Sequence, residues 1–188
     1  MRKLIVFNHM SLDGYFTDAQ GNMNFAQNAI PDAEWDAFVA GNASSGGLLL
    51  FGRITYELMI RFWPTPVAAE QMPDVAERMN NLPKVVFSRT LKEATWNNTK
   101  LVKGDLAGEI RKMKKESGED MVIFGSGSIV SQVAQEGLID EYQIVVDPVA
   151  LGKGRTMFDG IQEKLTMKLK NTRTFGNGNV LLGYEPMA

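Results

Sequence analysis

Residues 121–128 read Met121-Val122-Ile123-Phe124-Gly125-Ser126-Gly127-Ser128, an apolar run that ends in alternating glycines and serines. A continuous run of four apolar residues is typical of a strand that is buried on both faces of a sheet. We predict that a helix follows the turn and ends at Gly137, because glycine suits the position after a helix. This stretch therefore predicts one strand–turn–helix unit of an α/β protein.

Two other apolar runs end in the same way. Residues 48–51 are followed by Gly52-Arg53-Ile54-Thr55, and residues 84–87 by Ser88-Arg89-Thr90. If the three strands are parallel, their turns share the carboxyl edge of the sheet, where open α/β folds bind ligands. Two of these turns also open a helix, whose free N–H groups and positive dipole end favour an anion.

These turns predict a ligand that carries phosphate groups. Gly125 and Gly127 would let a pyrophosphate approach the backbone, with Ser126 and Ser128 as additional donors. Arg53 and Arg89 could neutralise a further phosphate, such as the 2′-phosphate of NADP. The alternative is that each turn is only a tight strand-to-helix connection, because the third glycine of a dinucleotide fingerprint and the lysine of a P-loop are both missing. Spacing alone does not name the ligand.

The rest of the chain completes an alternating pattern. We predict further strands at 4–7 and 142–146, and helices at 32–43, 53–60 and 73–80, as well as after Asp105. The tail alternates apolar and polar residues from Leu165, and Gly176-Asn177-Gly178 before residues 180–184 is typical of a hairpin. The expected architecture is an α/β fold with a mostly parallel mixed sheet, helices on both faces, an antiparallel C-terminal hairpin and one domain over residues 1–188.

The composition restricts the class of function. The chain has 188 residues, a net charge of −2, no cysteine and one histidine, His9. These values exclude thiolate zinc sites and disulfides, and they give no global field that favours nucleic acid or anionic lipid. No apolar run approaches the ~20 residues of a membrane span. We therefore expect a soluble cytoplasmic protein that binds a small molecule, with no metal site and no nucleic-acid or membrane partner.

Five segments in order carry a resemblance to a known family. They are Met10-Ser11-Leu12-Asp13-Gly14-Tyr15, residues 52–57, residues 86–91, residues 123–128, and residues 137–142 followed by 148–154. Together they resemble the C-terminal domain of bacterial bifunctional deaminase-reductases, whose fold is similar to that of dihydrofolate reductase. The resemblance implies an NADPH-dependent reductase that forms a homodimer. The deaminase half is absent, because a zinc deaminase needs cysteine ligands.

The resemblance also implies roles for the turn residues. Gly52, Arg53 and Thr55 would contact the cofactor phosphates, Ser88 and Arg89 would lie near the adenosine 2′-phosphate, and residues 125–129, which end at Ile129, would lie under the pyrophosphate. This distribution agrees with the interpretation of the turns themselves. Gly152-Lys153-Gly154-Arg155 could contact a phosphate as well, or could form only a strand crossover.

The predicted chemistry is hydride transfer from the cofactor, with a proton supplied by the protein. A carboxyl group in a partly apolar cleft is the usual proton source for a ring C=N bond. Asp36 is the first candidate, since dihydrofolate reductases carry their acid on this helix, and it could instead be a solvated helix residue. Asp13, in the Ser-Leu-Asp-Gly loop, is the second candidate, and could be only a turn residue.

Several other side chains could contact the substrate. Phe25 and Trp63 are predicted to stack on a planar ring, although aromatic residues at such places can simply pack. His9 could line the nicotinamide site or act as a structural hydrogen-bonding group. The predicted function is therefore an NADPH-dependent reductase of a small pyrimidine- or pteridine-like heterocycle, similar to the pyrimidine reductase of riboflavin biosynthesis. The alternatives are a non-catalytic dimeric NADP-binding module and a reductase of folate itself.

Overall fold

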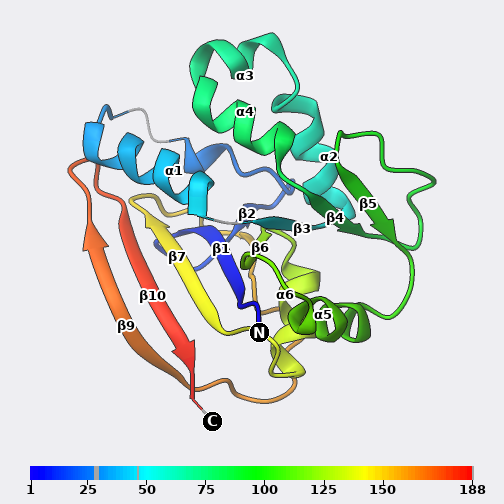
Figure 1. Ribbon diagram of the computed structural model, residues 1–188. Helices are drawn as coiled ribbons and strands as arrows, with labels where there is room; N and C mark the ends of the chain where they lie inside the picture. Colours follow the sequence, from blue (N-terminus) through cyan, green and yellow to red (C-terminus); the bar gives the residue numbers. More distant parts are fainter. Residues whose placement is uncertain (28–29, 46, 188) are drawn as a thin grey trace.

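The computed structural model describes residues 1–27, 30–45 and 47–187, and its centre is one eight-stranded sheet (Figure 1). In spatial order the strands are β5 (Thr99–Val102), β4 (Lys84–Phe87), β3 (Leu48–Gly52), β6 (Met121–Phe124), β1 (Leu4–Ser11), β7 (Glu141–Asp147), β10 (Val180–Pro186) and β9 (Met167–Thr174). The order is not the chain order, so the chain crosses the sheet repeatedly through its helices.

The sheet is mixed but mostly parallel, as predicted. Strands β5, β4, β3, β6, β1 and β7 pair in parallel, and β10 runs antiparallel to both β7 and β9. The β9–β10 hairpin turns through Gly178, which has a φ of +91°. Within this turn the Phe175 N–H donates to the Asn179 carbonyl over 3.0 Å. The predicted C-terminal hairpin is therefore confirmed.

Helices cover both faces of the sheet, which explains the continuous apolar strands (Figure 1). One face carries α5 (Leu106–Lys115) and α6 (Gly127–Gln135). The other carries α1 (Ala33–Ser45), α2 (Arg53–Phe62), α3 (Pro66–Gln71) and α4 (Pro73–Asn81). In β3, Leu48 and Leu50 pack toward the α5–α6 face, whereas Leu49 and Phe51 pack toward α2 and α4. The α/β architecture is thus confirmed.

Local signals fix the ends of several helices. Asp105 caps α5, and its carboxylate accepts a hydrogen bond from the Gly108 N–H over 3.1 Å. Gly137 follows α6 with a φ of +62°, the left-handed conformation expected of a glycine after a helix. The described residues include no helix that is long and apolar enough to cross a membrane.

Some elements were not predicted. The edge strand β5 has only one fully buried residue, Val102, so its sequence lacks the apolar run of the central strands. Helix α3 begins at Pro66, after the Thr65 side chain accepts a hydrogen bond from the Ala68 N–H. Short elements β2 (Thr17–Asp18), β8 (Gly154–Arg155) and η1 (Asn24–Ala26) complete the fold.

Candidate functional site

The three turns lie side by side, because β4, β3 and β6 are neighbours with the same direction. A cleft of about 530 Å³ opens at their carboxyl ends. Its walls include residues 52–55, Ser88, residues 126–129 and Arg155, together with residues of the segment from Phe16 to Met23. A second cavity of about 780 Å³ shares Phe87, Ser88, Ser128 and Ile129 with the first. Together they form a groove along this edge, which we call the carboxyl-edge groove.

Ser126 connects two of the turns. Its Oγ accepts a hydrogen bond from the Gly52 N–H over 2.7 Å and donates one to Thr55 Oγ1 over 2.9 Å. The Ser126 N–H also donates to Thr55 Oγ1, over 3.0 Å. The side chains of Ser126 and Thr55 are therefore buried in a bridge between the turns. The Ser126 hydroxyl proton is used in this bridge, whereas Thr55 Oγ1 only accepts in it, and both residues line the cleft. Their direct contact with the cofactor stays a prediction.

Contacts within the protein explain why the turn has glycine at positions 125 and 127. Gly125 has a φ of +59°, and a Cβ atom there would lie 2.8 Å from Thr55 Oγ1. At Gly127, a Cβ atom would lie 3.0 Å from the Phe16 ring. The side-chain amide of Asn8 also holds Gly125, accepting from its N–H over 2.6 Å and donating to its carbonyl over 3.3 Å. Close packing against Thr55 and Phe16 thus gives these two glycines a structural reason, and their contact with a pyrophosphate stays a prediction.

Backbone donors remain available at the groove. The N–H groups of Ile54, Gly127 and Ser128 lie in the first turns of α2 and α6, and first-turn groups of this kind have no acceptor within their own helix. Each helix contributes the positive end of its dipole to the same cleft. These groups form the kind of anion site that the sequence predicted.

Basic side chains line the groove as well. Arg89 is exposed and makes no ion pair within the described chain, whereas Arg53 pairs with Glu57 over 3.1 Å. Arg155 lines the first cavity and Lys103 the second. Lys103 was missed because it follows β5, the strand without an apolar run. Ser88 Oγ accepts from the Leu91 N–H over 2.9 Å, so this hydroxyl also shapes its own turn.

The environment of Asp13 does not suit a proton donor. Its carboxylate accepts hydrogen bonds from Ser11 Oγ at 2.7 Å, the Leu151 N–H at 3.0 Å and the Gly152 N–H at 2.7 Å. These bonds, the one from Ser11 above all, lower the pKa of Asp13 to about 2. A carboxyl group with this pKa is ionised at neutral pH and carries no proton to donate. Its hydrogen bonds tie the 11–14 loop to residues 151–152.

Asp36 does not lie where the sequence analysis expected it. The side chains of Trp35 and Phe38 point from α1 into the apolar cluster on the sheet. Because successive helical residues are rotated by about 100°, this orientation turns Asp36 toward solvent. The residue is exposed, and its side chain has no hydrogen-bond partner among the described residues. The observed position matches the alternative of a solvated helix carboxylate.

The predicted stacking residues also pack elsewhere. Trp63 belongs to the cluster between α2 and α4, and its Nε1–H donates to Met59 Sδ over 3.1 Å. Phe25 is half-buried in η1, which contacts β1, and lies outside the residues that line the groove. Neither ring borders the groove in this structure, so their predicted role requires a substrate that extends beyond it.

His9 has a partner that the sequence analysis did not consider. Its Nδ1 lies 3.0 Å from Oδ2 of Asp147, a carboxylate that is only 1% exposed. The two residues lie on neighbouring strands, β1 and β7, and they are 138 positions apart in the chain. No local pattern marks such a pair, because it depends on the register of the two strands.

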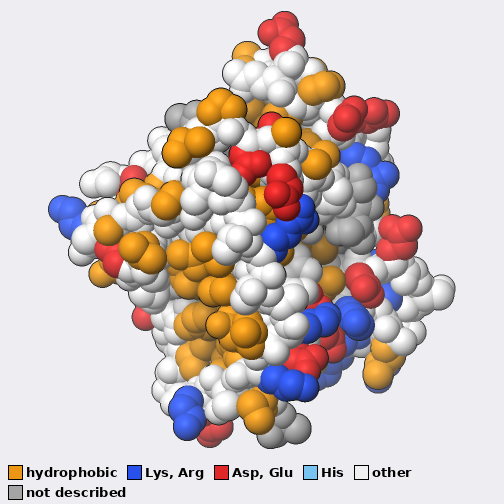
Figure 2. Space-filling view, turned by 90° about the vertical axis from the view of Figure 1, so that its left-hand side faces the viewer, with side chains coloured by type: hydrophobic (Ala, Val, Ile, Leu, Met, Phe, Trp, Pro, Cys, Tyr) orange, Lys and Arg blue, Asp and Glu red, His pale blue; other side chains and the backbone are white. Residues whose placement is uncertain are grey.

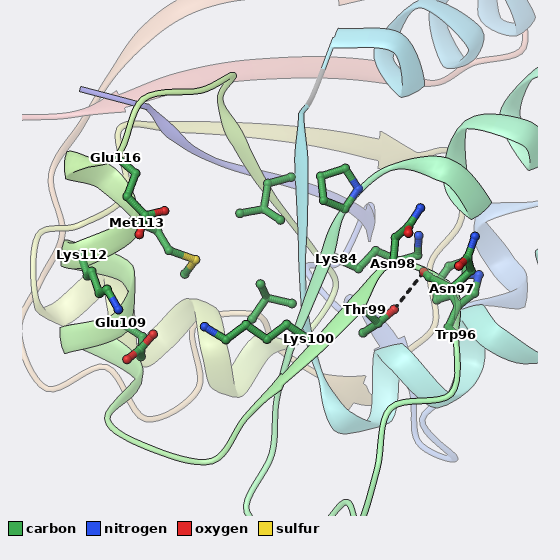
Figure 3. A pocket seen from close by; sticks show the side chains of 13 residues that line it. Lys84, Trp96, Asn97, Asn98, Thr99, Lys100, Glu109, Lys112, Met113 and Glu116 are labelled. Carbon is green, nitrogen blue, oxygen red and sulfur yellow. Dashed lines mark hydrogen bonds between the residues drawn. The ribbon is translucent and has the colours of Figure 1, made fainter.

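A further cavity, of about 620 Å³, lies at the opposite ends of β3 and β4 (Figure 3). Lys84 at its base is 1% exposed, and its Nζ donates to the carbonyls of Asn80 and Leu82 over 3.1 and 2.6 Å. It also lies 4.7 Å from the centre of the Trp96 ring. Burial lowers the pKa of Lys84 to about 8. These contacts give Lys84 the role of closing the end of α4.

The α/β sheet with its antiparallel C-terminal strands has the dihydrofolate reductase-like fold. The chain belongs to the RibD C-terminal domain family, whose model matches residues 2–181. It is 27% identical to the Bacillus subtilis (strain 168) protein YyaP over 98% of this chain and 95% of that protein. YwjB of the same organism is 25% identical over 93% of both chains.

Solved structures share the fold. A Shewanella sp. PV-4 protein assigned to riboflavin biosynthesis matches 99% of both chains with a TM-score of 0.79 and 23% identity. A pyrimidine reductase-like protein of Corynebacterium diphtheriae matches with a TM-score of 0.67 at 11% identity, covering all of this chain and 92% of its own. A deaminase/5-amino-6-(5-phosphoribosylamino)uracil reductase of Thermotoga maritima also gives 0.67, at 16% identity over 99% of this chain and 57% of that one.

Proposed function

We propose that this protein is an NADPH-dependent reductase of a small pyrimidine- or pteridine-like heterocycle. The observation that carries the proposal is the convergence of two helix N-termini on one groove, which also holds Arg89, a cation without an ion pair in the described chain. Membership of the RibD C-terminal domain family supports a reductase of the kind found in riboflavin biosynthesis.

The groove fits the charge of a phosphorylated dinucleotide. The N–H groups of Ile54, Gly127 and Ser128 would hold the pyrophosphate, since such groups bind anions without reorganisation. Arg89 would meet the 2′-phosphate, because a guanidinium matches phosphate geometry and charge. The buried Ser126 bridge would hold both turns at a fixed spacing. In this arrangement Ser126 and Thr55 position the backbone donors.

The nicotinamide supplies a hydride when the cofactor is bound. The protein then has to orient the heterocycle, exclude water and deliver one proton. Neither Asp36, which faces solvent, nor the strongly hydrogen-bonded Asp13 is arranged for that delivery. Another group near the carboxyl edge is therefore required for the proton.

Calorimetric titration with NADPH and with NADH tests the cofactor. We expect low-micromolar binding of NADPH and clearly weaker binding of NADH, because only NADPH offers a phosphate to Arg89. The protein with bound NADPH is then offered pterins, dihydropterins, diaminouracils and dihydrofolate, and NADPH oxidation is followed. Absence of binding by either nucleotide would contradict the cofactor proposal, and binding without turnover would favour the non-catalytic alternative.

We also propose that the protein forms a homodimer, as the family resemblance implies. The side of the molecule that carries β9 and β10 shows gathered hydrophobic side chains (Figure 2). Leu169, on the edge strand β9, is 52% exposed. Light scattering should give twice the monomer mass for the wild type, and Leu169→Lys should shift the protein toward the monomer if β9 lies in the contact. A monomeric wild type would contradict the dimer.

A further inference from the structure

We propose that His9 donates the proton in the reduction and that Asp147 positions its ring, an inference that rests on the proposed function. The pair is well defined: His9 Nδ1 lies 3.2 and 3.0 Å from the two carboxylate oxygens of Asp147. The histidine side chain is 18% exposed, whereas Asp147 is 1% exposed. The carboxylate is thus closed off from solvent, and the imidazole keeps an open side.

Aromatic rings fix the imidazole further. The Phe7 and Trp35 rings each make an edge contact with His9, with ring centres 5.8 Å away and nearly perpendicular planes. With Asp147 accepting from Nδ1–H, the free nitrogen is Nε2, and no described residue hydrogen bonds to it. A buried carboxylate that holds one ring nitrogen while the other points toward a reactant is the arrangement by which enzymes orient a histidine.

The strand register places His9 at the edge that carries the turns. Strands β1 and β6 pair only as far as Phe7 and Phe124, where the 125–128 turn leaves the sheet. Strands β1 and β7 continue together to Ser11 and Asp147. His9 is two residues past the end of β6, about 7 Å at ~3.3 Å per residue. It therefore stands beside the exit of the turn rather than in the middle of the sheet.

The neighbouring residue connects this position to the nucleotide turn. Asn8 holds both the N–H and the carbonyl of Gly125, while His9 points to the opposite face of β1, toward α1. The segment from Phe16 to Met23, which lines the cleft, continues into η1, and η1 contacts β1. A dinucleotide whose phosphates bind at 53–54 and 127–128 can therefore extend along the end of β1 toward the imidazole.

The step is balanced with one proton and one hydride. The carbon of the substrate C=N bond gains a hydride from the reduced nicotinamide, and the π electron pair moves to the nitrogen. That nitrogen forms a bond to the proton of His9 Nε2–H, whose bonding pair stays on the imidazole. The ring becomes neutral, keeps its Nδ1–H bond to Asp147 and regains a proton from water. The nicotinamide leaves oxidised.

Two measurements on the wild type test the placement, because His9 is the one histidine in the chain. The imidazole ¹⁵N shifts should show the proton of the neutral ring on Nδ1, as the contact with Asp147 requires. Diethylpyrocarbonate should modify Nε2, and NADP⁺ should slow this modification several-fold. A matched ligand without nicotinamide, 2′-phospho-ADP-ribose, should bind without slowing it.

The outcomes separate this inference from the proposed function. If calorimetry detects binding of neither nucleotide, the proposed function fails and the inference with it. If both bind and NADP⁺ leaves the modification rate unchanged, or if the neutral ring carries its proton on Nε2, only the inference fails.

Turnover with the heterocycle panel tests proton donation itself. His9→Gln should lower kcat about 100-fold or more, with NADPH affinity unchanged, because a positioned acid contributes about 10²–10⁴-fold. Asp147→Asn should lower kcat less and should remove the Nδ1–H preference in the ¹⁵N spectrum, while Asp147→Glu should restore part of both. An unchanged kcat in His9→Gln would overturn the donor role. So would an absence of turnover across the panel by wild type with NADPH bound.

Discussion

At the amino ends of β3 and β4, Lys84 Nζ donates to the carbonyls of Asn80 and Leu82, whereas at the carboxyl ends α2 and α6 present first-turn N–H groups that have no acceptor within their own helix. Both regions border cavities of similar size. The amino end buries a cation and satisfies it within the chain. The carboxyl end instead presents donors and the positive ends of two helices to the groove.

The difference shows what distinguishes a structural polar group from a binding site. A buried donor that already has acceptors stabilises the fold and has little to offer a ligand. Donors at a helix start that face an open groove have only water to displace. Cavity size therefore says little in this protein, and the hydrogen-bond state of the groups that line each cavity says more.

Breaking the bridge at the carboxyl end should have the largest effect. Ser126→Ala removes the acceptor of the buried Gly52 N–H and the partner of Thr55 Oγ1. We expect it to lower the free energy of unfolding by about 2–3 kcal/mol, because a buried donor loses its partner. Urea unfolding measures this loss. Ser128→Ala, on the exposed hydroxyl of the same turn, is the matched control and should change stability little. Equal effects of the two variants would contradict the bridge.

Titration at the amino end should have the next largest effect. Burial lowers the pKa of Lys84 from 10.5 to about 8, so between these pH values the unfolded chain binds more protons than the folded one. Stability should therefore rise with pH from about 8 to about 10.5, by about 1–2 kcal/mol. Urea unfolding across this range should show the rise in wild type and in Lys100→Met, the exposed control, but not in Lys84→Met. A rise that persists in Lys84→Met would contradict the assignment.

A substitution of Arg89 tests whether the carboxyl ends of the strands bind a phosphate. Arg89→Ala should weaken NADPH binding about tenfold, or about 1.4 kcal/mol, and leave NADH binding unchanged. Calorimetry with the two nucleotides gives the comparison. Lys168→Ala, which removes an exposed cation on β9 that pairs with Glu185, should change neither affinity. Equal losses for NADPH and NADH in Arg89→Ala would contradict a role at the 2′-phosphate.

The smallest effect is expected at the loop beside the groove. Asp13→Asn should speed hydrogen exchange of the Leu151 and Gly152 amides, because the ionised carboxylate accepts from both. The pKa of about 2 lies below the unfolded value of 3.8, so this contribution is complete above pH 4 and is lost as pH falls toward 2. Asp36→Asn, on an exposed carboxylate, should leave the exchange rates unchanged. Slow exchange of both amides in Asp13→Asn would show that other contacts hold the loop.

The central strands could be predicted because both of their faces are covered. Residues 48–51 and 121–124 are apolar throughout, and this pattern needs no knowledge of their neighbours. Strand β5 was not predicted because it lies at the edge of the sheet, where Thr99 and Lys100 are accessible to solvent. The edge that carries the groove followed from strand direction alone, so the position of the candidate site could be predicted along with the fold.

The side-chain roles within the site could not be predicted in the same way. The Ser126–Thr55 bridge joins residues 71 positions apart, and the His9–Asp147 pair depends on strand register. Asp36 was predicted to be the proton donor because of the helix on which it lies. Whether a residue of this helix reaches the site depends on the side of the helix that it occupies, and the buried side is occupied by Trp35. Sequence patterns therefore identified the backbone donors and left the partners of the side chains open.

The close contact of the turns also limits how this edge can evolve. A side chain at Gly52 or Gly125 would strike Ser126 or Thr55, so a change at one of these positions requires compensation at another. In related proteins these residues should covary as a unit. Arg89 and Lys103 have no such constraint, and single substitutions there can adapt the same interlocked turns to a different phosphorylated ligand.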